Sequence, residues 1–177
     1  MPNIITATYF TDKAELTIPN AISGNVGEGL NKKLQSIIDK YERMILLELL
    51  GGDQYNILQG ELDKLPFNSQ AVEAADTSHQ RLVNGYEDWQ GLKPLLGNYI
   101  YCFWMRSDEI KVGTVGSGKG KKQGFTIADR SSEYAERWND FITELEDTLE
   151  YLEASPDFEV SDDFPYDKYV MTNTFGF

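Results

Sequence analysis

The fold is decided by the stretch Pro94-Leu-Leu-Gly-Asn-Tyr-Ile-Tyr-Cys-Phe-Trp104. Proline suits the first turn of a helix, because the amide hydrogen that it lacks would have no partner there. The residues that follow it are apolar almost all round, and a helix of this kind is normally buried by its neighbours. We therefore expect a central helix here, with the rest of the chain packed around it.

The first two of the helices expected before this stretch are separated by a glycine pair. The first one covers 30–49, where apolar residues recur at the spacing of one helical face. Gly51 and Gly52 end it with a left-handed C-cap, and Asp53 caps a second, short helix that runs to Leu62 and stops before Pro66. The apolar face of the first helix consists of Leu30, Leu34, Ile37, Ile38, Tyr41, Ile45 and Leu49.

Two more amphipathic helices flank the central one. A cap at Ser69 begins a helix that Gly85 terminates, and Trp89 anchors the turn that follows. The last helix begins at a cap, Asp129 or Ser131, and carries one strong apolar stripe. The stripe consists of Tyr134, Trp138, Phe141, Ile142, Leu145, Leu149 and Leu152. We therefore predict an all-α fold of about five helices in a compact bundle.

The terminal segments are expected to be arms of a single domain, 1–177. The N-terminal arm and linker, 1–29, begin with a β-branched and aromatic run at 4–10 that predicts an extended conformation, and end in the turn-rich linker 23–29. The helical core covers 30–152. The C-terminal tail, 153–177, is acidic but also rich in phenylalanine and tyrosine, so we expect it to dock on a surface.

Composition excludes several classes of protein. The formal net charge is −13, which disfavours general binding to DNA or to anionic membranes. The single cysteine, Cys102, rules out an internal disulfide and fits a reducing compartment. No secretory signal pattern and no apolar run long enough for a membrane span is present, so we expect a cytosolic protein.

One cationic segment stands out from this acidic chain, the Gly/Lys loop at 111–124. It contains four lysines and no acidic residue: Lys111, Lys119, Lys121 and Lys122. These lysines are the candidate residues for contact with a partner or with a phosphate backbone, and the alternative is a solvated insertion without a partner. The flanks at 109–112 and 125–127 are expected either to pair as a small β-ribbon or to be disordered with the loop.

The same loop contains the most specific enzymatic motif in the sequence, but the motif is incomplete. Gly113 to Lys119 matches the phosphate-loop pattern G-x-x-x-x-G-K, yet Gly120 stands where a Ser or Thr must hold magnesium. His79 has no cysteine or second histidine near it in sequence that would complete a metal site or a catalytic triad, and the neighbours of Cys102 predict an inert, buried thiol.

Other groups with possible chemistry are better explained by structure. The carboxylates Glu144, Glu146 and Asp147 are expected on the solvated face of the last helix. The aromatic residues are expected in the core rather than in a base-stacking platform, because only Arg106 lies near them. These are Tyr99, Tyr101, Phe103, Trp104 and Trp138. We therefore expect no catalytic residue, no metal, no cofactor and no small-molecule substrate.

The order of the sequence elements resembles the head-tail connector proteins of tailed bacteriophages and prophages. The similarity extends from about Ile4 to Leu152 and rests on short motifs. They are the Leu-Leu-Gly step at the end of Tyr41–Gly51, Asn84-Gly85-Tyr86, Trp89-Gln-Gly91-Leu92-Lys93, the Tyr-rich run Asn98–Trp104, a Thr/Gly loop, and Arg137-Trp138-Asn139. The strongly acidic last helix and the long C-terminal tail are not part of the family's pattern.

The resemblance implies a non-enzymatic subunit that assembles as a ring beneath the capsid portal, where the tail attaches. Its partners would be further copies of itself and the portal and tail proteins, with passive contact to DNA, first in the bacterial cytoplasm and then in the virion. Two alternatives from other classes stay open. One is a cytosolic protein-interaction module, and the other is a nucleotide- or phosphate-binding protein that uses the loop Gly113–Lys119.

Overall fold

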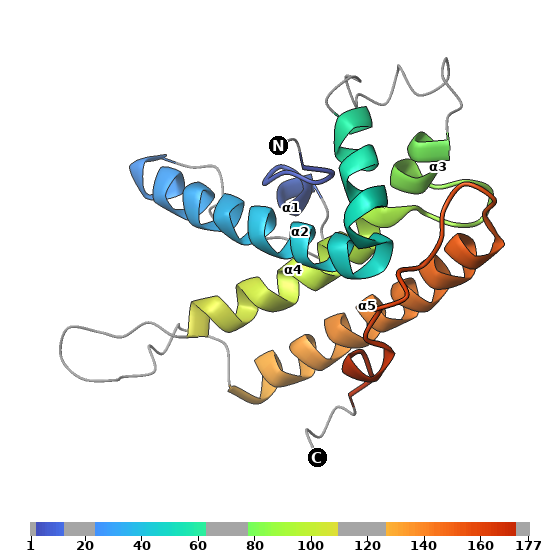
Figure 1. The fold of residues 1–177 in the computed structure, drawn as a ribbon. Helices are drawn as coiled ribbons and strands as arrows, with labels where there is room; N and C mark the ends of the chain where they lie inside the picture. Colours follow the sequence, from blue (N-terminus) through green and yellow to red (C-terminus); the bar gives the residue numbers. More distant parts are fainter. Residues whose placement is uncertain (1–2, 13–23, 63–77, 110–126, 173–177) are drawn as a thin grey trace.

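The computed structural model describes residues 3–12, 24–62, 78–109 and 127–172. The elements along the chain are α1 (Tyr9–Asp12), α2 (Gly24–Leu62), α3 (Ser78–Asn84), α4 (Leu92–Glu109), α5 (Ile127–Ala154) and a 3₁₀ turn, η3 (Tyr166–Lys168) (Figure 1). Within these ranges the chain forms no strand, and the sole β feature is a bridge between Tyr86 and Trp89. The prediction of an all-α fold is confirmed.

Helix α2 contains both helices that the sequence predicts on either side of the glycine pair. Gly51 interrupts it with φ 69° and ψ 174°, and α2 turns sharply there (Figure 1). The predicted break is therefore confirmed, and a second helical stretch follows directly after Gly51 and runs to Leu62. The helix also begins earlier than expected, at Gly24, so the linker predicted at 23–29 is helical over 24–29.

The other helices differ from the prediction mainly at their ends. Helix α5 begins at Ile127, so Asp129 and Ser131 lie inside the helix and are not its N-caps. Glu109 ends α4, so both outer ends of the predicted ribbon, Glu109 and Ile127, are helical. Residues 110–126 lie outside the described part of the chain, as does the predicted cap Ser69.

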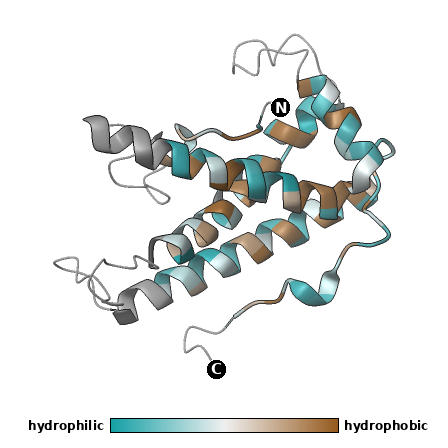
Figure 2. Ribbon diagram, turned by 60° about the vertical axis from the view of Figure 1, so that its left-hand side comes forward, coloured by the Kyte–Doolittle hydropathy of each residue, from teal (hydrophilic) through white to brown (hydrophobic). Residues whose placement is uncertain are grey.

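Helix α4 is central, as its apolar sequence predicts. It packs mainly against α5, then against α2, and more lightly against α3 (Figure 1). Pro94 lies in its first turn. Tyr99, in the middle of α4, is the largest fully buried side chain among the described residues and contacts Tyr41 of α2 and Phe141 of α5. In Figure 2 the hydrophobic residues of these three helices lie mainly where the helices face one another.

The N-terminal segment is folded rather than extended. Thr6 and Ala7 accept hydrogen bonds from the amides of Tyr9 and Phe10, which starts the short helix α1. Ile5 and Phe10 are fully buried in the core. The prediction of an extended conformation for 4–10 is therefore wrong, because burial of Ile5 and Phe10 in the core overrides a local strand propensity.

Glycine substitutions test the bend in α2. Gly51 has backbone angles that only glycine adopts readily, whereas Gly52 is helical and an added methyl group would meet no atom within 4 Å. We expect Gly51→Ala to lower the free energy of unfolding by about 1–3 kcal/mol. Gly52→Ala should be neutral or stabilising by up to about 1 kcal/mol.

Urea unfolding followed by circular dichroism measures both variants. Equal effects of the two substitutions would contradict the assignment of the bend to Gly51 alone.

Candidate functional site

The four lysines that the sequence predicts as contact residues for a partner lie outside the described residues. Lys111, Lys119, Lys121 and Lys122 all fall within 110–126. Two surface features of the described residues are the remaining candidates for a site. They are the C-terminal segment 155–172 and a pocket beside Trp89.

The C-terminal segment 155–172, which we call the strap, leaves the end of α5 and runs back over the helices (Figure 1). Three of its aromatic side chains, Phe158, Phe164 and Tyr169, are buried in the core. Tyr169 contacts Tyr99, Trp138, Phe141 and Phe164. The expectation that the aromatic tail docks on the body is confirmed for 155–172.

Hydrogen bonds to its main chain attach the strap at Ser161 and near its C-terminal end, at Val170 and Thr172. At the bend of α2, the Leu49 carbonyl accepts a hydrogen bond of 2.8 Å from the Ser161 amide. On α5, the Trp138 indole donates to the carbonyl of Val170 at 2.8 Å. The Asn139 side chain pairs with both main-chain groups of Thr172, donating to the carbonyl at 2.8 Å and accepting from the amide at 2.9 Å.

The Glu48 carboxylate of α2 binds the strap at residues 168 and 169, between these two attachment points. Glu48 accepts hydrogen bonds from Lys168, at 2.6 Å between Nζ and Oε1, and from the Tyr169 hydroxyl. Burial raises the pKa of Tyr169 well above the ordinary value, and the hydrogen bond to the Glu48 carboxylate raises it further. Tyr169 therefore stays protonated and donates at any physiological pH.

The outer side of the strap exposes apolar groups. Tyr166, Val170 and Met171 are each more than half exposed, at 55%, 59% and 56%. The backbone beneath them is attached to Trp138 and Asn139, so these side chains are presented from a fixed position. An exposed apolar group on a well-ordered support is a typical contact point for another protein.

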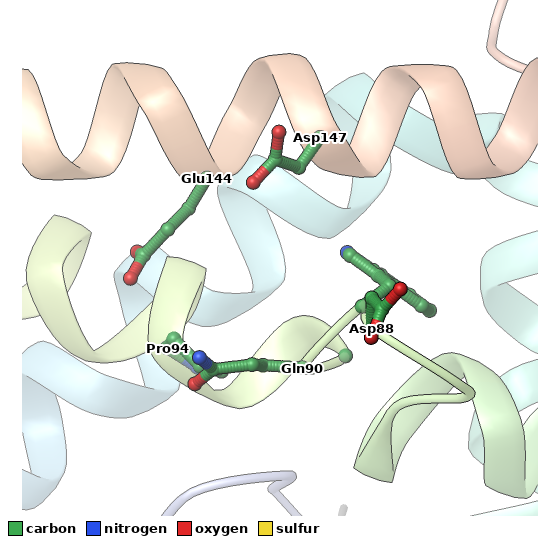
Figure 3. A pocket seen from close by; sticks show the side chains of 7 residues that line it. Asp88, Gln90, Pro94, Glu144 and Asp147 are labelled. Atoms are coloured by element: carbon green, nitrogen blue, oxygen red, sulfur yellow. The ribbon is translucent and has the colours of Figure 1, made fainter.

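The pocket lies between the turn that joins α3 to α4 and the side of α5 (Figure 3). Tyr86 and Trp89 exchange two main-chain hydrogen bonds across this tight turn, at 2.9 and 3.1 Å. Gly85 enters the turn with φ 96°, where a Cβ atom would collide with the carbonyl of Trp89. The Trp89 ring stacks on Tyr151 of α5 at 3.9 Å, which confirms that Trp89 anchors the turn.

The chemistry of the pocket is that of a small acidic recess. Its volume is about 100 Å³, and it is lined by Asp88, Trp89, Gln90, Gly91, Pro94, Glu144 and Asp147. Figure 3 shows Glu144 extending from α5 on the side of Pro94, and Asp147 close to the α5 ribbon. Pockets that bind small molecules usually have volumes of roughly 300–1,000 Å³, so this one accommodates a side chain or a few water molecules. Within the described ranges, no group of three His, Cys, Asp or Glu side chains is arranged to hold a metal ion.

The two candidates for nucleophilic or metal chemistry, Cys102 and His79, lie apart in the fold. Cys102 is fully buried on α4, and burial raises the pKa of its thiol to about 12. His79 of α3 lies edge-on against Phe158 of the strap, with ring centres 5.2 Å apart. In the part of the chain that is described, neither residue belongs to a group of side chains that could hold a metal ion.

The aromatic and acidic candidates agree with the sequence interpretation except at one position. Tyr99, Tyr101 and Trp104 are buried core residues, and Glu146 and Asp147 are exposed. Glu144 is half-buried, however, and accepts a hydrogen bond of 3.0 Å from the Asn98 side chain of α4. It therefore helps to join α4 to α5, and the prediction that it is only a solvated charge is wrong.

Sequence reasoning missed Glu42 of α2, a buried carboxylate that binds the N-terminal segment. A signal was available, because Glu42 follows Ile38 by four residues and precedes Ile45 by three, which places it on the apolar face of the helix. It missed Asn139 as well, whose amide pairs with the main chain of Thr172. No local pattern indicates that contact, because the two residues lie 33 positions apart.

Comparison of the chain with protein-family models, with curated proteins and with solved structures finds no match. The helices among the described residues include none that is both long enough and apolar enough to cross a membrane.

Removal of a hydroxyl group tests the anchoring of the strap. Tyr169→Phe keeps the buried ring but loses the hydrogen bond to Glu48, so we expect unfolding to become easier by about 1–2 kcal/mol. Tyr166→Phe is the matched control, because the Tyr166 ring is exposed, and its effect should stay within about 0.5 kcal/mol. Chemical denaturation compares the two, and equal stability of both variants would show that the Glu48 contact contributes nothing.

The reactivity of Cys102 follows from its burial. At pH 8 a thiol with a pKa of about 12 has almost no thiolate, and the surrounding side chains block reagents. Dithionitrobenzoate should therefore modify the folded protein very slowly and the urea-unfolded protein at once, at one thiol per chain. Full modification of the folded protein within minutes would disprove this placement.

Proposed function

We propose that this chain is a structural subunit of a tailed phage or prophage, similar to head-tail connector proteins, that assembles as a ring at the junction of portal and tail. The order of motifs in the sequence supports the proposal. A mostly helical domain with terminal segments laid over its surface is compatible with it. Its partners would be neighbouring copies and the portal and tail proteins, first in the bacterial cytoplasm and then in the virion.

The strap is the single observation that supports this role most. It presents Tyr166, Val170 and Met171 to solvent from a position fixed by hydrogen bonds to α5. In a ring, each subunit uses one surface to contact a different surface of the next, and a fixed apolar contact point suits such a heterologous interface. DNA would pass the acidic body, with its net charge of −13, without being held tightly.

A cytosolic protein-interaction module is the second candidate, and the same exposed side chains favour it. The two roles differ in the partner. A connector binds the portal and forms a ring of copies, whereas an interaction module binds a single cytosolic protein.

The geometry gives less support to a nucleotide-binding enzyme. In a phosphate loop the lysine lies directly at the start of a helix, whose free amides face the phosphates. In this sequence Gly120 follows Lys119, in the place of the Ser or Thr that would hold magnesium. The acidic pocket of about 100 Å³ is also too small and has the wrong charge for a nucleotide.

Co-purification with the portal protein of the same genome tests the connector role. We expect the wild-type chain to form a portal complex that contains about a dozen copies in a closed ring, visible by electron microscopy. Met171→Asp should reduce complex formation at least roughly tenfold, because it places a charge in the apolar contact.

Ile57→Asp is the matched control, since Ile57 is equally exposed on α2, at 56%, and lies outside the strap. It should leave the complex intact. Equal loss in both variants would remove the strap from the interface, and absence of any portal complex with the wild-type chain would reject the connector role.

A further inference from the structure

The acidic pocket beside Trp89 takes its carboxylates from two different parts of the chain. Asp88 belongs to the turn that joins α3 to α4, whereas Glu144 and Asp147 belong to α5 (Figure 3). Neither Asp88 nor Asp147 forms an ion pair with another described residue. Negative charges that surround one recess attract a cation into it.

The basic side chains near the turn are engaged elsewhere. Lys93 donates a hydrogen bond of 2.6 Å to the Asn84 side chain. The Arg81 guanidinium lies over the ring of Tyr86, 4.4 Å from its centre. The part of α5 that borders the pocket adds no positive charge, because residues 138–154 include six aspartates and glutamates and no lysine or arginine. The pocket therefore keeps its negative character.

A buried amide beside the pocket lacks a hydrogen-bond donor. Asn98 of α4 is 6% exposed, and its side-chain nitrogen donates to Glu144, which lines the pocket, at 3.0 Å. The oxygen of the same amide is buried and accepts no hydrogen bond from the described part of the chain. Asn98 also lies one helical turn after Pro94, another lining residue. A buried acceptor normally has a partner, so this oxygen indicates that a donor is missing next to the Glu144 carboxylate.

We propose that this pocket binds the ammonium group of a lysine side chain that a partner protein inserts. An ammonium group carries three donors and one positive charge, which complement the carboxylates and the free amide oxygen. The volume of about 100 Å³ admits the end of a side chain and excludes larger ligands. Trp89 lines the pocket, and its ring is held by stacking on Tyr151. A cation close to an indole ring gains further attraction.

Lysine fits the pocket better than other cations do. Arginine has a planar fork of donors that suits a single carboxylate approached in its own plane, whereas the acceptors here lie on two elements. A metal ion lacks its ligand set, since no three His, Cys, Asp or Glu side chains in the described ranges are arranged to hold one. The pocket contains no residue of the strap, so lysine binding here does not depend on the connector role.

Titration of the full chain with the peptide acetyl-Gly-Lys-Gly-amide, followed by NMR, tests the pocket. We expect saturable binding with a dissociation constant on the order of millimolar, because one side chain supplies the contact. The indole NH signal of Trp89 and the side-chain amide signals of Asn98 should shift together. The same peptide with norleucine in place of lysine has a stem of similar length without the charge, and it should cause no shift.

Two substitutions on α5 separate a specific pocket from general attraction to an acidic surface. Asp147→Asn removes a carboxylate of the pocket and should weaken peptide binding at least roughly fivefold. Glu146→Gln is the matched control, because it makes the same change of charge at the adjacent residue, which does not line the pocket, and its effect should stay within about twofold. Both side chains are exposed, so both variants should fold normally.

Equal loss of affinity in the two variants would show that the peptide is attracted by charge alone and would overturn the proposal. Unchanged Trp89 and Asn98 signals at about 50 mM peptide, where a millimolar site is nearly filled, would overturn it as well. Stronger binding of calcium ions or of the matching arginine peptide, with the same shifts, would assign the pocket to another cation and reject lysine as its ligand.

Discussion

The hydrogen bond between the Ser161 amide and the Leu49 carbonyl joins the bend of α2 to the strap. Gly51 breaks the hydrogen-bond pattern of α2, and the Leu49 carbonyl accepts the Ser161 amide at 2.8 Å. A buried carbonyl without a partner would destabilise the bend by about 1–3 kcal/mol, so the bend and the strap depend on each other. The bend turns the second part of α2 sharply away from the direction of the first part (Figure 1), and the strap in turn carries the exposed apolar residues.

The sequence predicted those structural features that depend on residues close together in the chain. The apolar run after Pro94 indicated the central helix, Gly51 indicated the break in α2, and the neighbours of Cys102 indicated a buried thiol. Contacts between distant residues were not predictable. The amides of Ile4 and Ile5 meet Glu42, and Ser161 meets Leu49, through tertiary packing that no local spacing encodes. The lysine loop stays a prediction, since it lies outside the described residues.

Both ends of the described chain are attached to α2 through specific polar groups. Glu42 binds the amides of residues 4 and 5, and Glu48 binds Lys168 and Tyr169 of the strap. The two glutamates belong to the same helix, so one element organises both terminal segments. An assembly subunit needs terminal segments whose positions are defined yet accessible, and this arrangement is consistent with the role proposed for the chain.

The coupling of the strap to the bend is tested most directly by hydrogen exchange at the Ser161 amide. If this amide is donated to Leu49, it exchanges only when α2 opens, and its protection factor matches that of the amides in the buried part of α2. Exchange of the Ser161 amide at the rate of an unstructured peptide, with α2 still protected, would show that the strap is not part of the folded unit.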